Sequence, residues 1–385
     1  DYEYLELRFN RTTRVLASCA FLIFQLGRIG VVLYLPSVAL SVVTGVDIYF
    51  CILMMGGISL LYTIMGGIEA VIWTDVMQVM VLLGGGLLCL AMMASQFEGG
   101  LKTIIDLGAQ DHKFELLNFA LDFQQPTFWV VILGGFFSNL IVYSSDQTMV
   151  QRYLATSDTL GAQKSLWITV LISFCSAGLF FFIGTALYAF FKNSPEALLP
   201  GMAATDAVFP WYIITQLPDG LSGLLIAGIF AAAMSSLSSS MNSAATAYTV
   251  DFHQNFGWKG EGLKVGRWAT LVFGLAGTLF AVVLASTEVK SIWDEFLKIV
   301  GLLTGGLGGV FLLGIISQRA NGVGAMIGLL GSALIQYWMG MTQPIHLLLF
   351  TATGFVSCIL IGYLASLCFP GANKPIPGLT IYDQS

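Results

Sequence analysis

Long apolar runs, interrupted by short charged or Gly/Pro-containing breaks, dominate this chain. Such runs predict helices that cross a bilayer, because a span needs about 20 apolar residues and every backbone group in lipid must pair within its own segment. The pattern predicts an all-α integral membrane protein with ten spans, at Thr12–Val43, Val46–Gly66, Ile68–Ser95, Thr127–Tyr143, Ala162–Phe191, Gly220–Val250, Val265–Ser286, Ser291–Ser317, Asn321–Met339 and Ile345–Phe369.

The composition supports one membrane domain and disfavours several function classes. Of the 385 residues, 56% are hydrophobic and 10% are charged, whereas soluble domains carry about 25% charged residues. No basic stripe that would suit a nucleic acid is present. The six cysteines lack paired spacing and no HExxH motif occurs, which disfavours a metalloenzyme. We expect residues 1–11 to form a cytoplasmic loop, 12–369 a single transmembrane domain of ten spans in the lipid bilayer, and 370–385 a cytoplasmic tail.

The distribution of Lys and Arg predicts the orientation, because both are enriched in cytoplasmic loops. With the N-terminal stretch and the C-terminus in the cytoplasm, the inside holds Arg8, Arg11, Arg14, Arg152, Lys164, Lys259, Lys264, Arg267, Arg319 and Lys374, against Lys102, Lys113, Lys192 and Lys290 outside. The amphipathic segment Gln96–Pro126 is expected to cap the extracellular face. Since Asp1 is not a plausible natural start, we also expect further helices before this sequence.

Two charges deep in the predicted spans are the best functional pointers, since each costs several kcal/mol in lipid unless it is paired or hydrated. Arg28 lies about 20 Å along its helix and suits a carboxylate or sugar oxygens; the alternative is an Arg paired with helix ends for structure. Asp75 lies about 12 Å from the cytoplasmic end and should take up a proton or hold a cation; the alternative is an interfacial Asp. Nearer the outside, Lys298 is placed to pair with Asp294 at i, i+4.

The uncharged span Gly220–Val250 is unusually rich in hydroxyls, at Ser235, Ser236, Ser238, Ser239 and Ser240. Ser238 and Ser239 share a helical face with Ser235 and lie about 18–20 Å from the cytoplasmic end. Hard cations take oxygen ligands, and neutral hydroxyls suit a site that must release its ion. The alternative is that Ser and Ala only pack this helix against its neighbours. A sodium site that these serines share with Asp75 is therefore a hypothesis that the sequence supports.

Four stretches carry a specific family resemblance, namely YEYLELRF, WTDVMQ, TMVQRYL and AAAMSSLSSSMNS. With them the chain resembles the sodium:solute symporter family over essentially its whole length. The resemblance implies a LeuT-type fold with two inverted five-helix repeats, of which this sequence holds core helices 3–10 plus two further C-terminal spans. It implies a sodium-coupled symporter of the plasma (inner) membrane that is not an enzyme, with Na⁺ as the co-transported ion and no organic cofactor.

The resemblance also implies two sodium sites. Carbonyls of the first core helix would share one sodium with Ala232, Ser235 and Ser236 of the eighth core helix. The second sodium would be held by Asp75, Ser235, Ser238 and Ser239.

The stretch QLGRIGVVLYLPS most resembles bacterial sialic acid symporters, whose third core helix carries an Arg at the substrate site, here Arg28. The same comparison offers Phe136 and Asn139 as pocket residues. Val142 stands where galactose-carrying members have a pocket-closing Tyr, which favours an acidic sugar, sialic acid. The alternatives are a sodium/monocarboxylate or sodium/neutral sugar symporter and, in another class, an ion channel, which would need a ring of selectivity groups along a pore.

Overall fold

The computed structural model is helical throughout the residues that it describes, which are 2–65, 68–115, 117–145, 159–198, 207–218, 220–287, 291–369 and 379–382. The helices are α1 (Glu3–Arg8), α2 (Arg11–Thr44), α3 (Ile48–Met65), α4 (Ile68–Ser95), α5 (Leu101–Gln110), α6 (Phe128–Ser145), α8 (Thr159–Asn193), η1 (Pro195–Ala197), α9 (Val208–Gln216), α10 (Leu221–Tyr248), η3 (Thr249–Gln254), α11 (Gly262–Ser286), α12 (Ile292–Ile316), α13 (Gly322–Thr342) and α14 (Leu349–Cys368).

The predicted all-α membrane class is confirmed. Nine helices in the described part of the chain are long and apolar enough to cross a membrane, and α6 is a shorter apolar helix. Each predicted span falls on one of these ten. Capping explains several of the boundaries: the side chains of Asn10, Ser291 and Asn321 accept a backbone N–H in the first turn of α2, α12 and α13, as N-cap residues do.

One expectation about the segments outside the spans needs correction, and a second segment is now described in more detail. The stretch before the first span was expected to be a loop but contains α1, because the Arg8 side chain anchors it to the carbonyls of Gly314 and Ser317. In the amphipathic segment Gln96–Pro126, only the first half forms a helix, α5. The described part of its second half is turns and coil, in which Asn118 and Asp122 bond nearby backbone N–H groups and so compete with helix formation.

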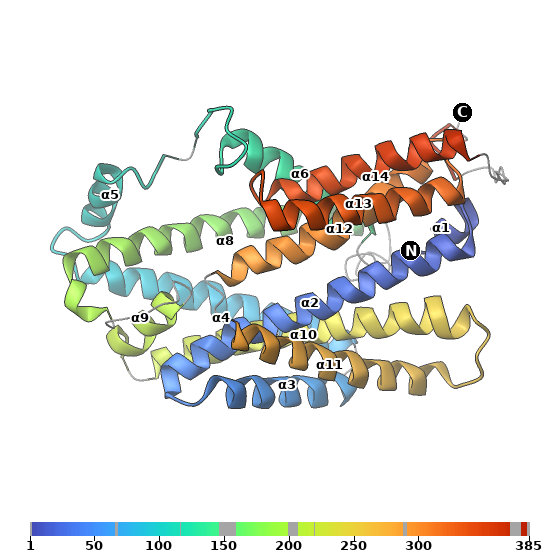
Figure 1. The fold of residues 1–385 in the computed structure, drawn as a ribbon. Coiled ribbons are helices and arrows are strands. Elements are labelled where there is room, and N and C mark those ends of the chain that lie inside the picture. Colours follow the sequence, from blue (N-terminus) through green and yellow to red (C-terminus); the bar gives the residue numbers. More distant parts are fainter. Residues whose placement is uncertain are drawn as a thin grey trace.

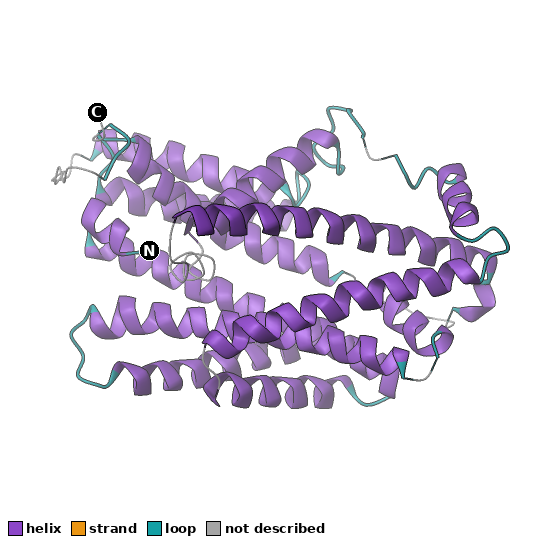
Figure 2. Ribbon diagram, turned by 180° about the vertical axis from the view of Figure 1, so that it is seen from behind, coloured by secondary structure: helices purple, strands orange, loops and turns teal. Residues whose placement is uncertain are grey.

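The long helices lie side by side in two groups (Figures 1 and 2). One group consists of α2, α3, α10 and α11, and the other of α6, α12, α13 and α14; α2 packs against α12 between them, and α4 packs against α10 and α8. Glycines permit close approach in the second group: a Cβ on Gly305 or Gly309 would lie 2.8 or 2.9 Å from a carbonyl oxygen of α14. Small residues at such contacts are typical of membrane helix pairs.

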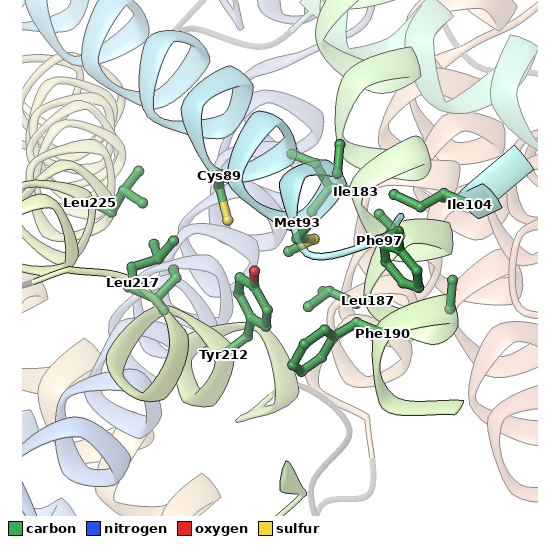
Figure 3. Packing of buried hydrophobic residues seen from close by; sticks show 14 residues of the cluster. Cys89, Met93, Phe97, Ile104, Ile183, Leu187, Phe190, Tyr212, Leu217 and Leu225 are labelled. Atoms are coloured by element: carbon green, nitrogen blue, oxygen red, sulfur yellow. The ribbon is translucent and has the colours of Figure 1, made fainter. Parts of the chain in front are cut away.

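An apolar cluster lies at one end of the molecule, where α9 packs between α4 and α8. Figure 3 shows Cys89 and Met93 of α4 facing Tyr212 of α9, with Phe190 of α8 beside them. The outward side of α8 is different: Trp167, Phe174 and Phe181 recur every seven residues and are 75%, 79% and 81% exposed. An apolar stripe of this size on a water-facing helix would be unfavourable, so this side of α8 is suited to lipid.

Candidate functional site

The serine-rich helix α10 opens onto a cavity of about 560 Å³. Ala232 and Ser236, one helical turn apart, line it, and among the described residues Ser236 is the only hydroxyl residue of its wall. The remaining wall is apolar and comes from α2, α4, α9, α10 and α12, through Val31, Val32, Leu35, Pro36, Ala39, Leu82, Phe209, Pro210, Ile229, Ala233, Ile292, Trp293 and Phe296. Two of the three residues predicted for the first sodium site therefore border one chamber.

One backbone carbonyl of α2, at a residue that lines this cavity, lacks its helical hydrogen bond. Pro36 lies inside α2 and has no N–H, so the carbonyl of Val32 loses its normal helical partner. Val32 and Pro36 both line the cavity, across from α10. A carbonyl without an N–H and a serine hydroxyl are the kinds of neutral oxygen that an alkali cation accepts as ligands.

The hydroxyls predicted for the second sodium site are partly pre-arranged. Ser238 is fully buried, and its Oγ donates to the Ser235 carbonyl over 3.0 Å. Because the hydroxyl hydrogen is used in this bond, the Ser238 oxygen keeps its lone pairs as an acceptor. Ser235 and Ser239 are half-buried on the same side of α10.

The side chain of Asp75 lies outside the described residues, so its approach to these serines stays a prediction. The helix that carries it, α4, does pack closely on α10. A Cβ on Gly85 would lie 2.0 Å from a Leu225 methyl, and one on Gly228 would lie 2.8 Å from a Val81 methyl. The helix pairing that the hypothesis needs is present.

Arg28 is half-buried in the middle of α2. Two nearby glycines allow this helix to pack closely against its neighbours. A Cβ on Gly27 would lie 2.7 Å from Ile299 of α12, and one on Gly30 would lie 2.3 Å from Phe280 of α11. This tight packing fixes the height and rotation of α2 at the arginine.

The depth of Arg28 relative to the serines follows from the antiparallel register of α2 and α10. The Arg14 Nε of α2 donates to Asp251 Oδ1, just past the end of α10, over 2.8 Å. Arg28 is then about 21 Å along α2 from this ion pair, and Ser239 is about 18 Å from it along α10, at 1.5 Å per residue. The proposed substrate arginine and sodium hydroxyls therefore share nearly the same depth.

The two pocket residues predicted on α6 are not brought to this chamber. Phe136 is 60% exposed, and the Asn139 amide donates to the Gly135 carbonyl of its own helix over 2.8 Å. The helix α6 packs against α12 and α14, and neither residue lines the cavity. Their part in the substrate site stays a prediction.

The ion pair between Arg14 and Asp251 was not predicted from the sequence. Arg14 contacts Asp251 and Glu6 over 2.7 and 2.8 Å, and the Ser18 hydroxyl donates to the second oxygen of Asp251 over 2.9 Å. Sequence reasoning used Arg14 only as an orientation signal. The Arg and Ser at i, i+4 were the available hint, but their partner is 237 residues away. Lys298 was also misassigned: it pairs with Glu295 over 2.7 Å and not with Asp294, because the longer Glu side chain reaches it at i, i+3.

Comparison with known proteins decides the family. The profile of the sodium:solute symporter family matches residues 2–332. The chain belongs to the sodium:solute symporter family. It is 34% identical to the sodium/sialic acid symporter NanT of Aliivibrio fischeri, over 96% of this chain and 74% of that protein. It is 32% identical to the sodium/sialic acid symporter SiaT of Proteus mirabilis, over 97% and 76%.

A solved structure extends the comparison to the fold of this symporter. A Na⁺-coupled sialic acid symporter, in a substrate-bound outward-open state with a novel Na⁺ site, has a TM-score of 0.87, 31% identity and coverage of 97% of this chain and 78% of its own. The human sodium-coupled monocarboxylate transporter 1 is also similar, with 31% identity over 90% of this chain and 57% of its length. The predicted LeuT-type bundle and sodium-coupled symport are thereby confirmed.

The chemistry of this symporter's chamber suits a weakly held monovalent cation. Within the described ranges, no group of three or more His, Cys, Asp or Glu side chains could hold one metal ion. The donors at hand are neutral oxygens, namely the hydroxyls of α10 and the Val32 carbonyl of α2, which bind an alkali ion without the strong attraction of several carboxylates. Such a site can release its ion in each transport cycle.

Proposed function

We propose that this symporter imports sialic acid, an acidic sugar, together with two sodium ions. The observation that carries the proposal is the register of α2 and α10, by which Arg28 lies at nearly the same depth as the serine hydroxyls, and one of these serines, Ser236, borders the chamber. The names of NanT and SiaT supply the substrate class. An arginine near the sodium ligands suits the substrate carboxylate, because its planar fork binds carboxylates with two parallel hydrogen bonds.

In this proposal the two sodium sites share α10. Ala232, Ser235 and Ser236 contribute to the first. Asp75, Ser235, Ser238 and Ser239 contribute to the second, with the buried carboxylate neutralised by its ion. Phe136 and Asn139 complete the substrate pocket when the core rearranges during transport.

The orientation follows from the charges. Glu6, Arg14 and Asp251 lie at the end of the bundle that carries the other basic residues near the helix ends, which include Arg8, Arg11, Lys264 and Arg267. Positive residues mark the cytoplasmic side, so α1 and the C-terminal residues face the cytoplasm of the plasma (inner) membrane. The cap formed by α5 and α9 then faces the outside.

Sodium binding from outside stabilises the outward-open form, and rocking of one helix group against the other exposes the site to the cytoplasm. Two sodium ions with one singly charged anion carry one net positive charge, which is worth about 2.3 kcal/mol per 100 mV of membrane potential. The two sodium concentration gradients add to this. Accumulation of an anion against its gradient is therefore feasible.

Uptake by the protein in proteoliposomes tests the proposal. Asp75→Ala or Ser238→Ala should lower the Hill coefficient for sodium from near two to near one, while Ser332→Ala, a buried serine on α13 remote from the chamber, should not. Arg28→Ala should abolish uptake of acidic sugars in a protein that still folds. Normal uptake by Arg28→Ala removes its substrate role, and an unchanged coefficient removes the second sodium site.

A sodium/monocarboxylate symporter is the second candidate, because the human transporter named above is 31% identical. Both substrates carry a carboxylate for Arg28, so the arginine does not separate them. A competition experiment separates them, in which lactate, pantothenate or glucose is added during uptake of labelled sialic acid. Strong inhibition by lactate alone favours a monocarboxylate symporter.

A further inference from the structure

A glutamine in the interior of α2 has no hydrogen-bond partner. Gln25 is fully buried, and neither its amide nitrogen nor its amide oxygen is bonded to any group in the described part of the chain. An amide can donate two hydrogen bonds and accept two, and buried polar groups in native proteins are nearly always satisfied by protein or ordered water. The Gln25 amide therefore points to a partner of another kind.

A serine on α10 shows the same feature. Ser240 is 1% exposed, and its hydroxyl has no hydrogen-bond partner among the residues that the structure describes. Its neighbour Ser238 does bond the Ser235 carbonyl, so a local backbone bond is within reach of serines on this helix. Ser240 and Gln25 are the buried side chains with unpaired polar atoms on these two helices within the described ranges.

The faces of the two helices bring these side chains together. On α2, Arg14, Ser18, Phe21 and Gln25 follow one another at steps of four, three and four, which keeps them on one face. The first two bind Asp251, and Phe21 packs in one cluster with Ala244 and Ala247 of α10. Gln25 therefore lies on the face of α2 that contacts α10.

The corresponding face of α10 contains Ser240. Counting back from Asp251, steps of four, three and four reach Ala247, Ala244 and Ser240, and a further turn reaches Ser236, which borders the cavity across from α2. Gln25 is 11 residues past Arg14, and Ser240 is 11 residues before Asp251. At 1.5 Å per residue, both lie about 16 Å from the ion pair, so they share one depth in one interface.

The chemistry of the pair selects its occupant. No direct hydrogen bond joins the two side chains, so a small polar molecule is needed between them. A cation would suit the amide oxygen and the hydroxyl but would face the amide N–H groups, which repel it. Water both donates and accepts, and buried waters typically make about three hydrogen bonds to otherwise unsatisfied groups.

We propose that Gln25 and Ser240 hold one buried water molecule between α2 and α10, and that this bridge positions Arg28 and Ser236 relative to each other. Arg28 is the next residue along the same face of α2, at i+3, and Ser236 is one turn from Ser240 on α10. Loosening the bridge displaces the sodium-side hydroxyl from the substrate-side arginine. The transport consequence rests on the proposed function; the water site does not.

The test uses Gln25→Met, Ser240→Ala and the double variant, with Ser332→Ala as a matched control. Ser332 is also 1% exposed, but its hydroxyl donates to Gly354 over 2.8 Å on α13 and α14, far from the site. Three quantities are measured on the full protein: the midpoint of thermal unfolding with and without sodium, the sodium concentration for half-maximal uptake, and a cryo-electron microscopy map at a resolution that shows ordered water.

We expect a solvent peak within hydrogen-bond distance of both side chains. Each single variant should lower the unfolding midpoint, and the double variant should lower it no further than the worse single, because the same water is lost once. Each single variant should also raise the half-maximal sodium concentration by roughly three- to tenfold, as expected for one hydrogen bond. Ser332→Ala should lower the midpoint only.

Additive single effects, a map without the peak, or sodium activation unchanged from the wild type would overturn the inference. Failure of the proposed function is distinguishable. If the wild-type protein takes up no sialic acid, the solvent peak and the non-additive midpoints still report on the bridge, and the sodium-dependent shift of the midpoint replaces uptake as the readout.

Discussion

Replacing Asp251 by Asn removes the charge at the centre of the ion cluster that joins α1, α2 and the end of α10. The side chains of Arg14 and Asp251 are 10% and 5% exposed. Two guanidinium nitrogens of Arg14 approach one Asp251 oxygen at 2.7 and 2.8 Å, and Ser18 occupies the other at 2.9 Å. The substitution keeps the shape of the side chain but leaves the buried guanidinium with Glu6 as its one acidic partner.

The size of the loss follows from burial. Removing one partner of a buried ion pair costs about 3–5 kcal/mol, because the other charge stays buried without compensation. Since Glu6 still contacts Arg14 and the Asn oxygen still accepts a hydrogen bond, we expect Asp251→Asn to lower the free energy of unfolding by about 3 kcal/mol, at the low end of this range. Ser18→Ala should cost about 1.5 kcal/mol, as for one hydrogen bond to a charged group.

Glu6→Gln provides the internal comparison. Its side chain is 31% exposed, and partly exposed ion pairs are worth about 0.2–1 kcal/mol. The free energy of unfolding of each variant can be measured by reversible denaturation in mixed micelles. The combination Arg14→Met with Asp251→Leu should recover most of the loss, because an apolar pair of similar volume often replaces a buried ion pair without cost. If Asp251→Asn costs no more than Glu6→Gln, the argument from burial is wrong.

Two further predictions concern helix packing and pH. Gly305→Val should destabilise the protein by about 1–3 kcal/mol or more, because its Cβ would lie 2.8 Å from the Thr351 carbonyl oxygen, whereas Gly57→Ala, with open space around it, should be neutral; thermal unfolding of both variants checks this. The pKa of Asp111 is lowered, chiefly by the Lys192 ammonium that donates to it. Because the folded pKa of Asp111 is depressed, the contact between α5 and α8 should be fully present above the ordinary Asp pKa. It should be lost as pH falls through the lower pKa of the folded state. Pepsin cleavage of the loop after α5 should therefore require more acid in the wild type than in Lys192→Met.

The hydrophobic pattern was sufficient to predict the number and extent of the long helices, because lipid leaves an apolar run no other regular structure. The boundaries of α4 were predicted to the residue, and those of α10 differ by one or two. The chain continues past α10 as a π-helix over Thr249–Gln254, which hydropathy cannot reveal. There Arg14 and Ser18 bind Asp251. These contacts with α2, and not the local sequence pattern, determine the conformation of the segment.

Only those parts of the candidate site that follow from the periodicity of a single helix or from a family motif could be predicted from the sequence. Ala232 and Ser236 were assigned to one site through the family resemblance, and the structure places both on the wall of one cavity. The pairing of Arg14 with Asp251 depends on the register between helices far apart in the sequence, which no local rule gives. Gln25 could not be singled out from the sequence, because one neutral amide hardly changes the mean hydropathy of an apolar run, although in the fold both of its polar atoms are buried without a partner among the described residues.

These polar groups all lie along the interface between α2 and α10. It carries the ion pair of Arg14 and Asp251 at one end, Gln25 and Ser240 at about 16 Å from that pair, and Ser236 on the wall of the chamber. In an apolar medium each polar pair can be satisfied only when the two helices keep one register, since a slide of one turn, about 5.4 Å, separates all of them at once. The interface therefore resists sliding far more than an apolar contact of equal area.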